Sequence, residues 1–119
     1  DMTSKGKLST HVLDNFHGRP ANHLRWELWS VGKNDQKIVE GVTNSDGRTD
    51  RLLLEGEELV TGGYRLRFYV ADYYRNLAVE LADPPFLDVV SIDVQLIAGE
   101  RYHVPLLMTP WSYSTYRGS

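Results

Sequence analysis

Cysteine is absent from this chain of 119 residues. A disulfide framework is therefore excluded, and so are a thiolate nucleophile and any metal site built on cysteine. No apolar run approaches the roughly 18 residues that a membrane-spanning helix requires. Charge of one sign is not in excess either, since 13 basic and 16 acidic side chains give a formal net charge of −3 without a basic stripe. We therefore expect neither a nucleic-acid partner nor a membrane partner.

The remaining composition is that of a globular protein. Hydrophobic residues make up 41% of the chain and charged residues 24%, and the length suits one domain with one core. We expect residues 1–7 to form an N-terminal tail and residues 8–119 to form the domain. No secretion-signal pattern is present, which favours a cytoplasmic location. A periplasmic location is the alternative if a signal segment was removed ahead of Asp1.

Strand patterns dominate the chain. In residues 64–70, for example, Tyr64, Leu66, Phe68 and Val70 alternate with polar or exposed positions, which predicts a strand with one face on a core. Turn-forming residues separate the segments, and their spacing favours a β-sandwich. The segments that we expect to be strands are residues 8–13, 24–31, 37–43, 51–54, 64–70, 90–96, 102–107 and 113–116.

One short helix interrupts this pattern. We expect it to span residues 73–77, directly after the fifth strand, with Asp72 as its N-terminal cap.

Four polar features stand out against this all-β background. His11 and His103 both lie on expected strands, each on the face opposite to the apolar residues. Residues 43–48 read as a tight turn that ends at Arg48. Pro105 cannot donate a ladder hydrogen bond, so it marks an edge, an end or a bulge. The terminus, residues 113–119, is aromatic and strand-forming, unlike a disordered tail.

Each of these features also has an ordinary structural interpretation. A strand histidine is more often a surface or interface residue, and an arginine after a turn is more often solvated. His17 and His23 read as exposed loop residues, and four histidines without a short spacing predict no metal site. Neither a phosphate-binding loop nor a nucleophile elbow is present. Composition and periodicity alone thus lead to a globular all-β domain with two strand histidines and an ordered C-terminus.

Three motifs extend this interpretation, because together they resemble the transthyretin-like 5-hydroxyisourate hydrolases over nearly the whole length. The first is Leu-Ser-Thr-His-Val-Leu-Asp at 8–14, followed by Gly-Arg-Pro-Ala at 18–21. The second is Thr-Asn-Ser-Asp-Gly-Arg at 43–48. The third is Tyr-His-Val-Pro-Leu-Leu at 102–107, followed by the Tyr-Arg-Gly-Ser ending at 116–119. That ending is the most specific of these features.

The resemblance implies a sandwich of two four-stranded antiparallel sheets with one short helix. It also implies a homotetramer, a dimer of dimers, with active sites in a channel where the dimers meet. Carried over by position, the catalytic residues are His11, Arg48, His103 and Ser119. Substrate-binding residues would be Arg48, Tyr116, Arg117, Gly118 and Ser119.

The implied reaction is hydrolysis of 5-hydroxyisourate to 2-oxo-4-hydroxy-4-carboxy-5-ureidoimidazoline in urate degradation, without cofactor or metal. A histidine suits deprotonation of water, and a guanidinium suits the charge that develops on a carbonyl oxygen. We assign His103 as general base and His11 as its partner or a substrate ligand, although these two roles can be exchanged. A serine nucleophile, Ser114 or Ser119, is the mechanistic alternative.

Two functional alternatives stay open from sequence. One is a non-catalytic carrier of small ligands, as in transthyretin, and the other is a β-sandwich interaction module. The histidine pair, Arg48 and the terminal tetrapeptide favour the enzyme.

Overall fold

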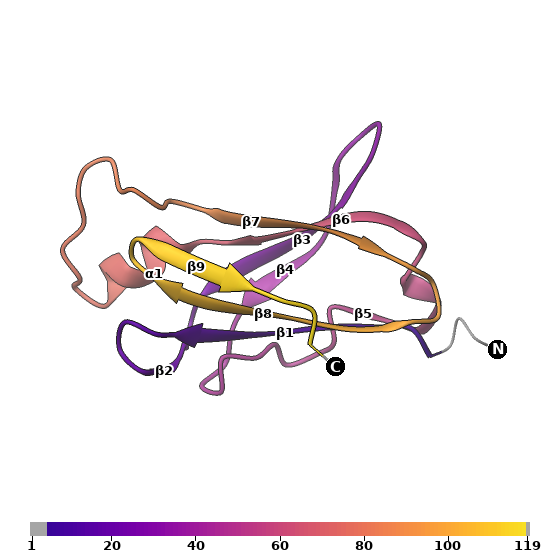
Figure 1. The fold of residues 1–119 in the computed structure, drawn as a ribbon, viewed down its shortest axis with the longest axis horizontal. Coiled ribbons are helices and arrows are strands. Elements are labelled where there is room, and N and C mark those ends of the chain that lie inside the picture. Colours follow the sequence, from indigo (N-terminus) through magenta and orange to yellow (C-terminus); the bar gives the residue numbers. More distant parts are fainter. Residues whose placement is uncertain (1–4, 119) are drawn as a thin grey trace.

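The computed structural model describes residues 5–118, and two β-sheets pack face to face in it (Figure 1). One sheet has the order β4-β3-β6-β7, made of Gln36–Val42, Arg25–Val31, Gly62–Phe68 and Val90–Leu96. The other has the order β2-β1-β8-β9, made of Arg19–Pro20, Lys7–Asp14, Arg101–Thr109 and Ser112–Thr115. A further two-residue strand, β5 (Leu54–Glu55), pairs with the start of β1, and the 3-10 turn η2 (Gly56–Glu58) follows it. The predicted all-β sandwich is confirmed.

The core lies between the sheets, where the apolar positions of the alternating strands meet. In β1, Leu8 and Val12 are fully buried, while Ser9 and His11 face outward. The core face expected for residues 64–70 is also confirmed, because Leu66 and Phe68 are fully buried. The outward face of β1 and β8 is consequently free to carry polar chemistry.

One strand pair departs from the antiparallel prediction. β1 and β8 run parallel over their whole shared length, from Lys7 opposite Arg101 to Asp14 opposite Met108. Antiparallel neighbours are typically joined by a hairpin, but these two strands are joined through most of the chain. Strand patterns in a sequence carry no information on this relative direction.

The fourth expected strand is shorter and later than predicted. Of residues 51–54, only Leu54 lies in β5, where it pairs with Leu8. Leu53 still reaches β1, since its backbone N–H donates to the carbonyl oxygen of Leu8 at 2.9 Å.

The helix begins earlier than expected, and the predicted cap is wrong. Helix α1 spans Val70–Asn76, with Tyr69 at the cap position and no side-chain cap hydrogen bond. Asp72 lies instead in the first turn, where a carboxylate is favourable to the helix dipole. The N–H of Ala71 donates to the backbone oxygen of Asp88 at 3.0 Å, so a loop satisfies part of this helix end in place of a side chain. No helix within residues 5–118 has the length and apolar character needed to cross a membrane.

Asp14 ties the end of β1 to this helix. Its carboxylate is fully buried and accepts hydrogen bonds from the Tyr73 and Tyr74 hydroxyls, both at 2.8 Å. His17 is an exposed loop residue, as predicted, and its Nδ1 lies 2.6 Å from the same carboxylate. Burial alone would raise the pKa of Asp14, but these hydrogen bonds outweigh it and hold the pKa below the ordinary value.

Candidate active site

The outward faces of β1 and β8 form the floor of the candidate site. In the parallel register, Ser9 lies directly opposite His103 and Lys7 opposite Arg101. All four side chains point away from the core, because their neighbours along each strand point into it. The site is therefore a consequence of strand alternation on two strands that are remote in sequence.

A tight turn brings Arg48 to this floor. The Asn44 side-chain oxygen accepts hydrogen bonds from the backbone N–H groups of Asp46 and Arg48, at 2.9 and 3.1 Å. Gly47 has a φ of 75°, and a Cβ there would lie 2.4 Å from the carbonyl oxygen of Val12, so a side chain cannot be accommodated. The Gly47 oxygen in turn accepts the Val12 N–H at 2.8 Å, which holds the turn against β1.

His11 secures the same turn from the strand. Its backbone forms a bridge with Arg48, and its Nε2 lies 2.9 Å from the carbonyl oxygen of Asp46. The structure thus brings His11, Arg48 and His103 to one region of the surface, as the family resemblance implied.

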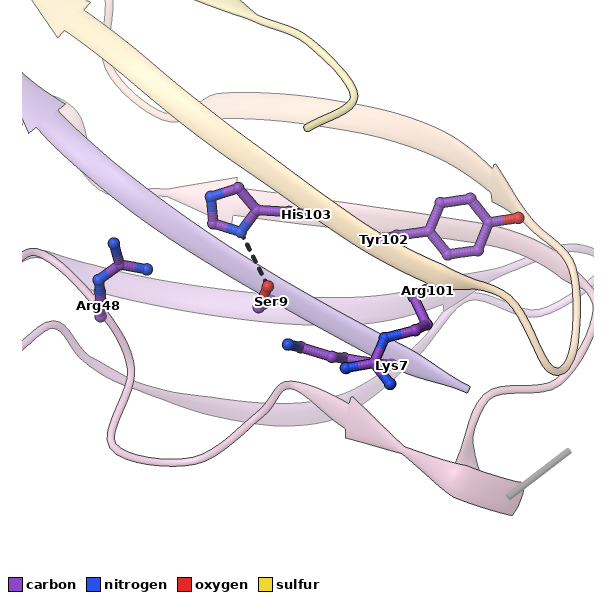
Figure 2. Close-up of a pocket in the computed structure, with 6 residues that line it drawn as sticks. All are labelled: Lys7, Ser9, Arg48, Arg101, Tyr102 and His103. Atoms are coloured by element: carbon purple, nitrogen blue, oxygen red, sulfur yellow. Dashed lines mark hydrogen bonds between the residues drawn. The ribbon is translucent and has the colours of Figure 1, made fainter. Parts of the chain in front are cut away.

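The pocket between these elements has a volume of about 490 Å³ and a positive lining (Figure 2). No carboxylate lines it, and among residues 5–118 none of its three cations forms an ion pair. Such a pocket favours an anionic or carbonyl-rich ligand. Its lining residues are Lys7, Ser9, Arg48, Arg101, Tyr102 and His103.

His103 has the electrostatic properties of a base in this setting. Burial lowers its pKa below the ordinary value. The nearby charges of Arg48, His11 and Lys7 lower that pKa further. The neutral imidazole is therefore favoured near neutral pH, and one ring nitrogen holds a free lone pair.

Pro105 decides how the C-terminal segment meets this histidine. The β8–β9 ladder ends at Leu106 opposite Thr115, directly beside Pro105, which has no N–H to continue it. Of the three predicted alternatives, an edge, an end or a bulge, the structure shows a ladder end on the β9 side, while the ladder with β1 continues through Pro105. Pairing resumes in the same register at His103 and Gly118, where the Gly118 N–H donates to the His103 oxygen at 2.6 Å.

The terminal residues divide between two places. Gly118 lies against the His103 ring, whereas Tyr116 and Arg117 line a separate groove beside β7. The Arg117 guanidinium stacks 4.4 Å above the ring of Tyr102 and donates to the Arg101 oxygen at 3.3 Å. In this single chain Tyr116 and Arg117, which were predicted to bind substrate, therefore line this groove and not the cationic pocket. Ser119, predicted to be catalytic, lies outside the described residues.

Sequence reasoning missed four residues that line the pocket, Lys7, Ser9, Arg101 and Tyr102. For the first three the signal was present, because strand alternation puts Lys7 and Ser9 on the face of His11, and Arg101 on the face of His103. The parallel register, which brings the two faces together, is what the pattern alone did not contain. Within residues 5–118, no group of three or more histidine, aspartate or glutamate side chains has the arrangement to hold a metal ion.

Fold and site together define a transthyretin-like β-sandwich with a cationic, histidine-containing pocket on its outer face. A model of the HIUase/Transthyretin family matches residues 8–118, and the chain belongs to that family.

Individual relatives agree. The chain is 52% identical to a 5-hydroxyisourate hydrolase from Deinococcus radiodurans, over 99% of this chain and 100% of that protein. Among solved structures it resembles an (S)-allantoin synthase with a TM-score of 0.92 and 36% identity, over 98% of this chain and 44% of the synthase chain. It also resembles the 5-hydroxyisourate hydrolase of Klebsiella pneumoniae, with a TM-score of 0.78 and 30% identity, over 95% of this chain and 99% of that chain.

Proposed function

We propose that this protein hydrolyses 5-hydroxyisourate to 2-oxo-4-hydroxy-4-carboxy-5-ureidoimidazoline, a step of urate degradation. The observation that carries the proposal is one pocket holding a histidine of lowered pKa and a guanidinium without a carboxylate partner among residues 5–118. Full-length similarity to a hydrolase of that name supports it. The family name covers both hydrolases and transthyretins, so membership alone does not exclude a carrier. A carrier, however, needs neither a base nor a charge stabiliser.

The geometry supports the following mechanism. His103 accepts a proton from water as the water oxygen bonds to the acyl carbon of the substrate ring. The carbonyl electron pair moves onto its oxygen, where the guanidinium of Arg48 stabilises the negative charge. When the tetrahedral intermediate collapses, the C–N bond breaks and the proton on His103 passes to the departing nitrogen. His11 holds the Arg48 turn, and its charge acts on His103.

Assembly belongs to the same proposal. We expect a homotetramer, a dimer of dimers, with the pocket in the channel between dimers. Two features support this assembly. β7 and β9 are edge strands of their sheets, and three large aromatic residues in or next to β9 are exposed: Trp111, Tyr113 and Tyr116. We also propose that the protein is located in the cytoplasm.

A direct assay tests the activity. Urate oxidase generates 5-hydroxyisourate in place, and its ultraviolet absorbance is followed with and without the protein. Because this substrate decays on its own, the measured quantity is the difference between the two rates. We expect a clear acceleration that a chelator does not diminish. Equal decay in both cuvettes contradicts the proposed function, and loss of the acceleration with EDTA, restored by zinc, contradicts the metal-free mechanism.

A further inference from the structure

The ring of His103 is held from two sides. Its Nδ1 lies 2.8 Å from the hydroxyl oxygen of Ser9, which faces it across the β1–β8 pair. Figure 2 shows this contact and shows the second ring nitrogen pointing away from Ser9. On the other edge, Gly118 packs so closely that a Cβ there would lie 2.9 Å from His103 Cδ2. Of the two nitrogens, only Nε2 is left without a protein partner among residues 5–118.

This arrangement bears on the tautomer of the imidazole. A neutral histidine carries one proton, and the nitrogen that lacks it is the one that acts as a base. If Nδ1 carries the proton and donates it to Ser9, the lone pair is on Nε2. If the Ser9 hydroxyl donates instead, Nε2 carries the proton and cannot deprotonate water. The direction of one hydrogen bond thus decides whether His103 is active.

We propose that Ser9 is a positioning residue that accepts the Nδ1–H of His103 and fixes the tautomer whose Nε2 lone pair is free for water. The catalytic consequence rests on the proposed hydrolase function, but the tautomer is a property of the protein without substrate. Ser9 itself exchanges no proton and forms no bond to substrate. It accepts the same Nδ1–H before, during and after the proton resides on Nε2.

Two observations make the direction of this hydrogen bond consequential, and only the proposed direction leaves Nε2 able to accept a proton. The serine and the histidine are register partners in a continuous parallel ladder, so their backbones cannot separate without breaking the sheet. The cations around the pocket, Lys7 and Arg48, favour a neutral ring, and a neutral ring makes the choice of tautomer matter.

The first test needs no substrate. Long-range ¹H–¹⁵N spectra of the full, ¹⁵N-labelled chain report the protonated nitrogen of each histidine at a pH where His103 is neutral, and His103→Asn identifies its signals. We expect the Nδ1–H tautomer in the wild type and in Ser9→Thr, which keeps the hydroxyl. Ser9→Ala should lose this preference. An Nε2–H tautomer in the wild type would overturn the proposal.

The second test is kinetic. Removing the hydrogen-bond partner that orients a metal-bound histidine typically costs about 10- to 100-fold in activity or metal affinity, so Ser9→Ala should lower kcat by a similar factor with little change in KM. Ser9→Thr should restore most of the loss. The Ser9 hydroxyl, as an acceptor, favours the protonated ring. Its loss in Ser9→Ala should therefore move the acid limb of the kcat profile to lower pH. The matched control is Ser91→Ala, an exposed serine on β7 of the opposite sheet, which should be unchanged.

The outcomes separate the competing explanations. If Ser9 were a nucleophile, Ser9→Ala would fall to the uncatalysed rate and intact mass spectrometry of a quenched wild-type reaction would reveal an acyl adduct; that result overturns the positioning role. Unchanged kcat and pH profile in Ser9→Ala overturns it as well. An inactive wild type with His103 in the Nδ1–H form would contradict only the proposed function.

Discussion

His103 concentrates the chemistry that this chain can perform. Its neighbours are a hydroxyl on one strand, a guanidinium on a turn and a backbone N–H from the C-terminal segment, and each comes from a different motif. The burial and positive charge that lower its pKa also make the pocket attractive to an electron-rich ligand. The positive charge that keeps His103 neutral, and so available as a base, is thus the same charge that attracts the ligand.

Loss of the His103 imidazole or of the Arg48 guanidinium should lower turnover severely. A general base typically contributes about 10²- to 10⁴-fold and a charge-stabilising donor about 10²- to 10³-fold, so His103→Asn and Arg48→Ala should each lower kcat at least about 10²-fold. Both side chains lie outside the core, so melting temperatures should stay near that of the wild type. Near-normal turnover of either variant would show that its assigned role is wrong. His23→Asn, at an exposed loop position, is the control.

The pH dependence has a defined sign. His103 acts as a base only when neutral, so kcat/KM should rise with pH through its pKa, on a limb below the ordinary value of 6.5. Arg48→Ala removes one of the charges that lower this pKa, so in the residual activity the limb should move to higher pH.

At the scale of elements, the β1–β8 pair decides which side chains meet. A slip of one residue would bring core positions to the outer face, because side chains alternate along a strand. The Asp14 cluster at the far end of β1 opposes such a slip, since it joins this strand to α1 through two tyrosine hydroxyls.

Asp14→Asn should therefore destabilise the fold without touching the pocket. Hydrogen bonds to charged groups contribute about 1.5–3 kcal/mol, and we expect a loss of that size in the free energy of unfolding. Urea denaturation followed by tryptophan fluorescence measures it. The control is Asp93→Asn, which breaks an exposed pair with Arg65 and should cost about 0–1 kcal/mol.

The same cluster predicts an acid sensitivity. The pKa of Asp14 is lowered in the folded state, so its stabilisation is present above the unfolded value of 3.8 and is lost as the pH falls below it. In Asp14→Asn the stability should depend less on pH in this range. An unchanged acid profile would mean that other carboxylates dominate acid unfolding.

For the whole molecule, the open edge strands β7 and β9 lead to a prediction about assembly. Static light scattering should give the mass of a tetramer at assay concentrations, because single chains would leave the β7 and β9 edges and their aromatic neighbours in water. Assays over a dilution series should show specific activity falling where the tetramer dissociates. A monomer with full activity would contradict a site between dimers.

Much of this molecule could be predicted from local patterns. Alternation placed seven strands almost entirely and gave the outward direction of His11 and His103, because the side-chain period of a strand is a local property. Pro105 marked the end of a ladder for an equally local reason, its missing N–H. The cap of α1 was mispredicted because the Asp88 backbone, distant in sequence, fulfils part of that role.

The tertiary structure alone decided which of these local features meet. The sequence by itself determined the all-β class, the outward histidines, the turn before Arg48 and, through its motifs, the family. It did not determine that β1 and β8 run parallel, and so it could not reveal that Ser9 faces His103 or that Lys7 and Arg101 line the same pocket. Strand direction and register depend on how both sheets bury their apolar faces together, and that is a property of the whole packed chain and not of any segment.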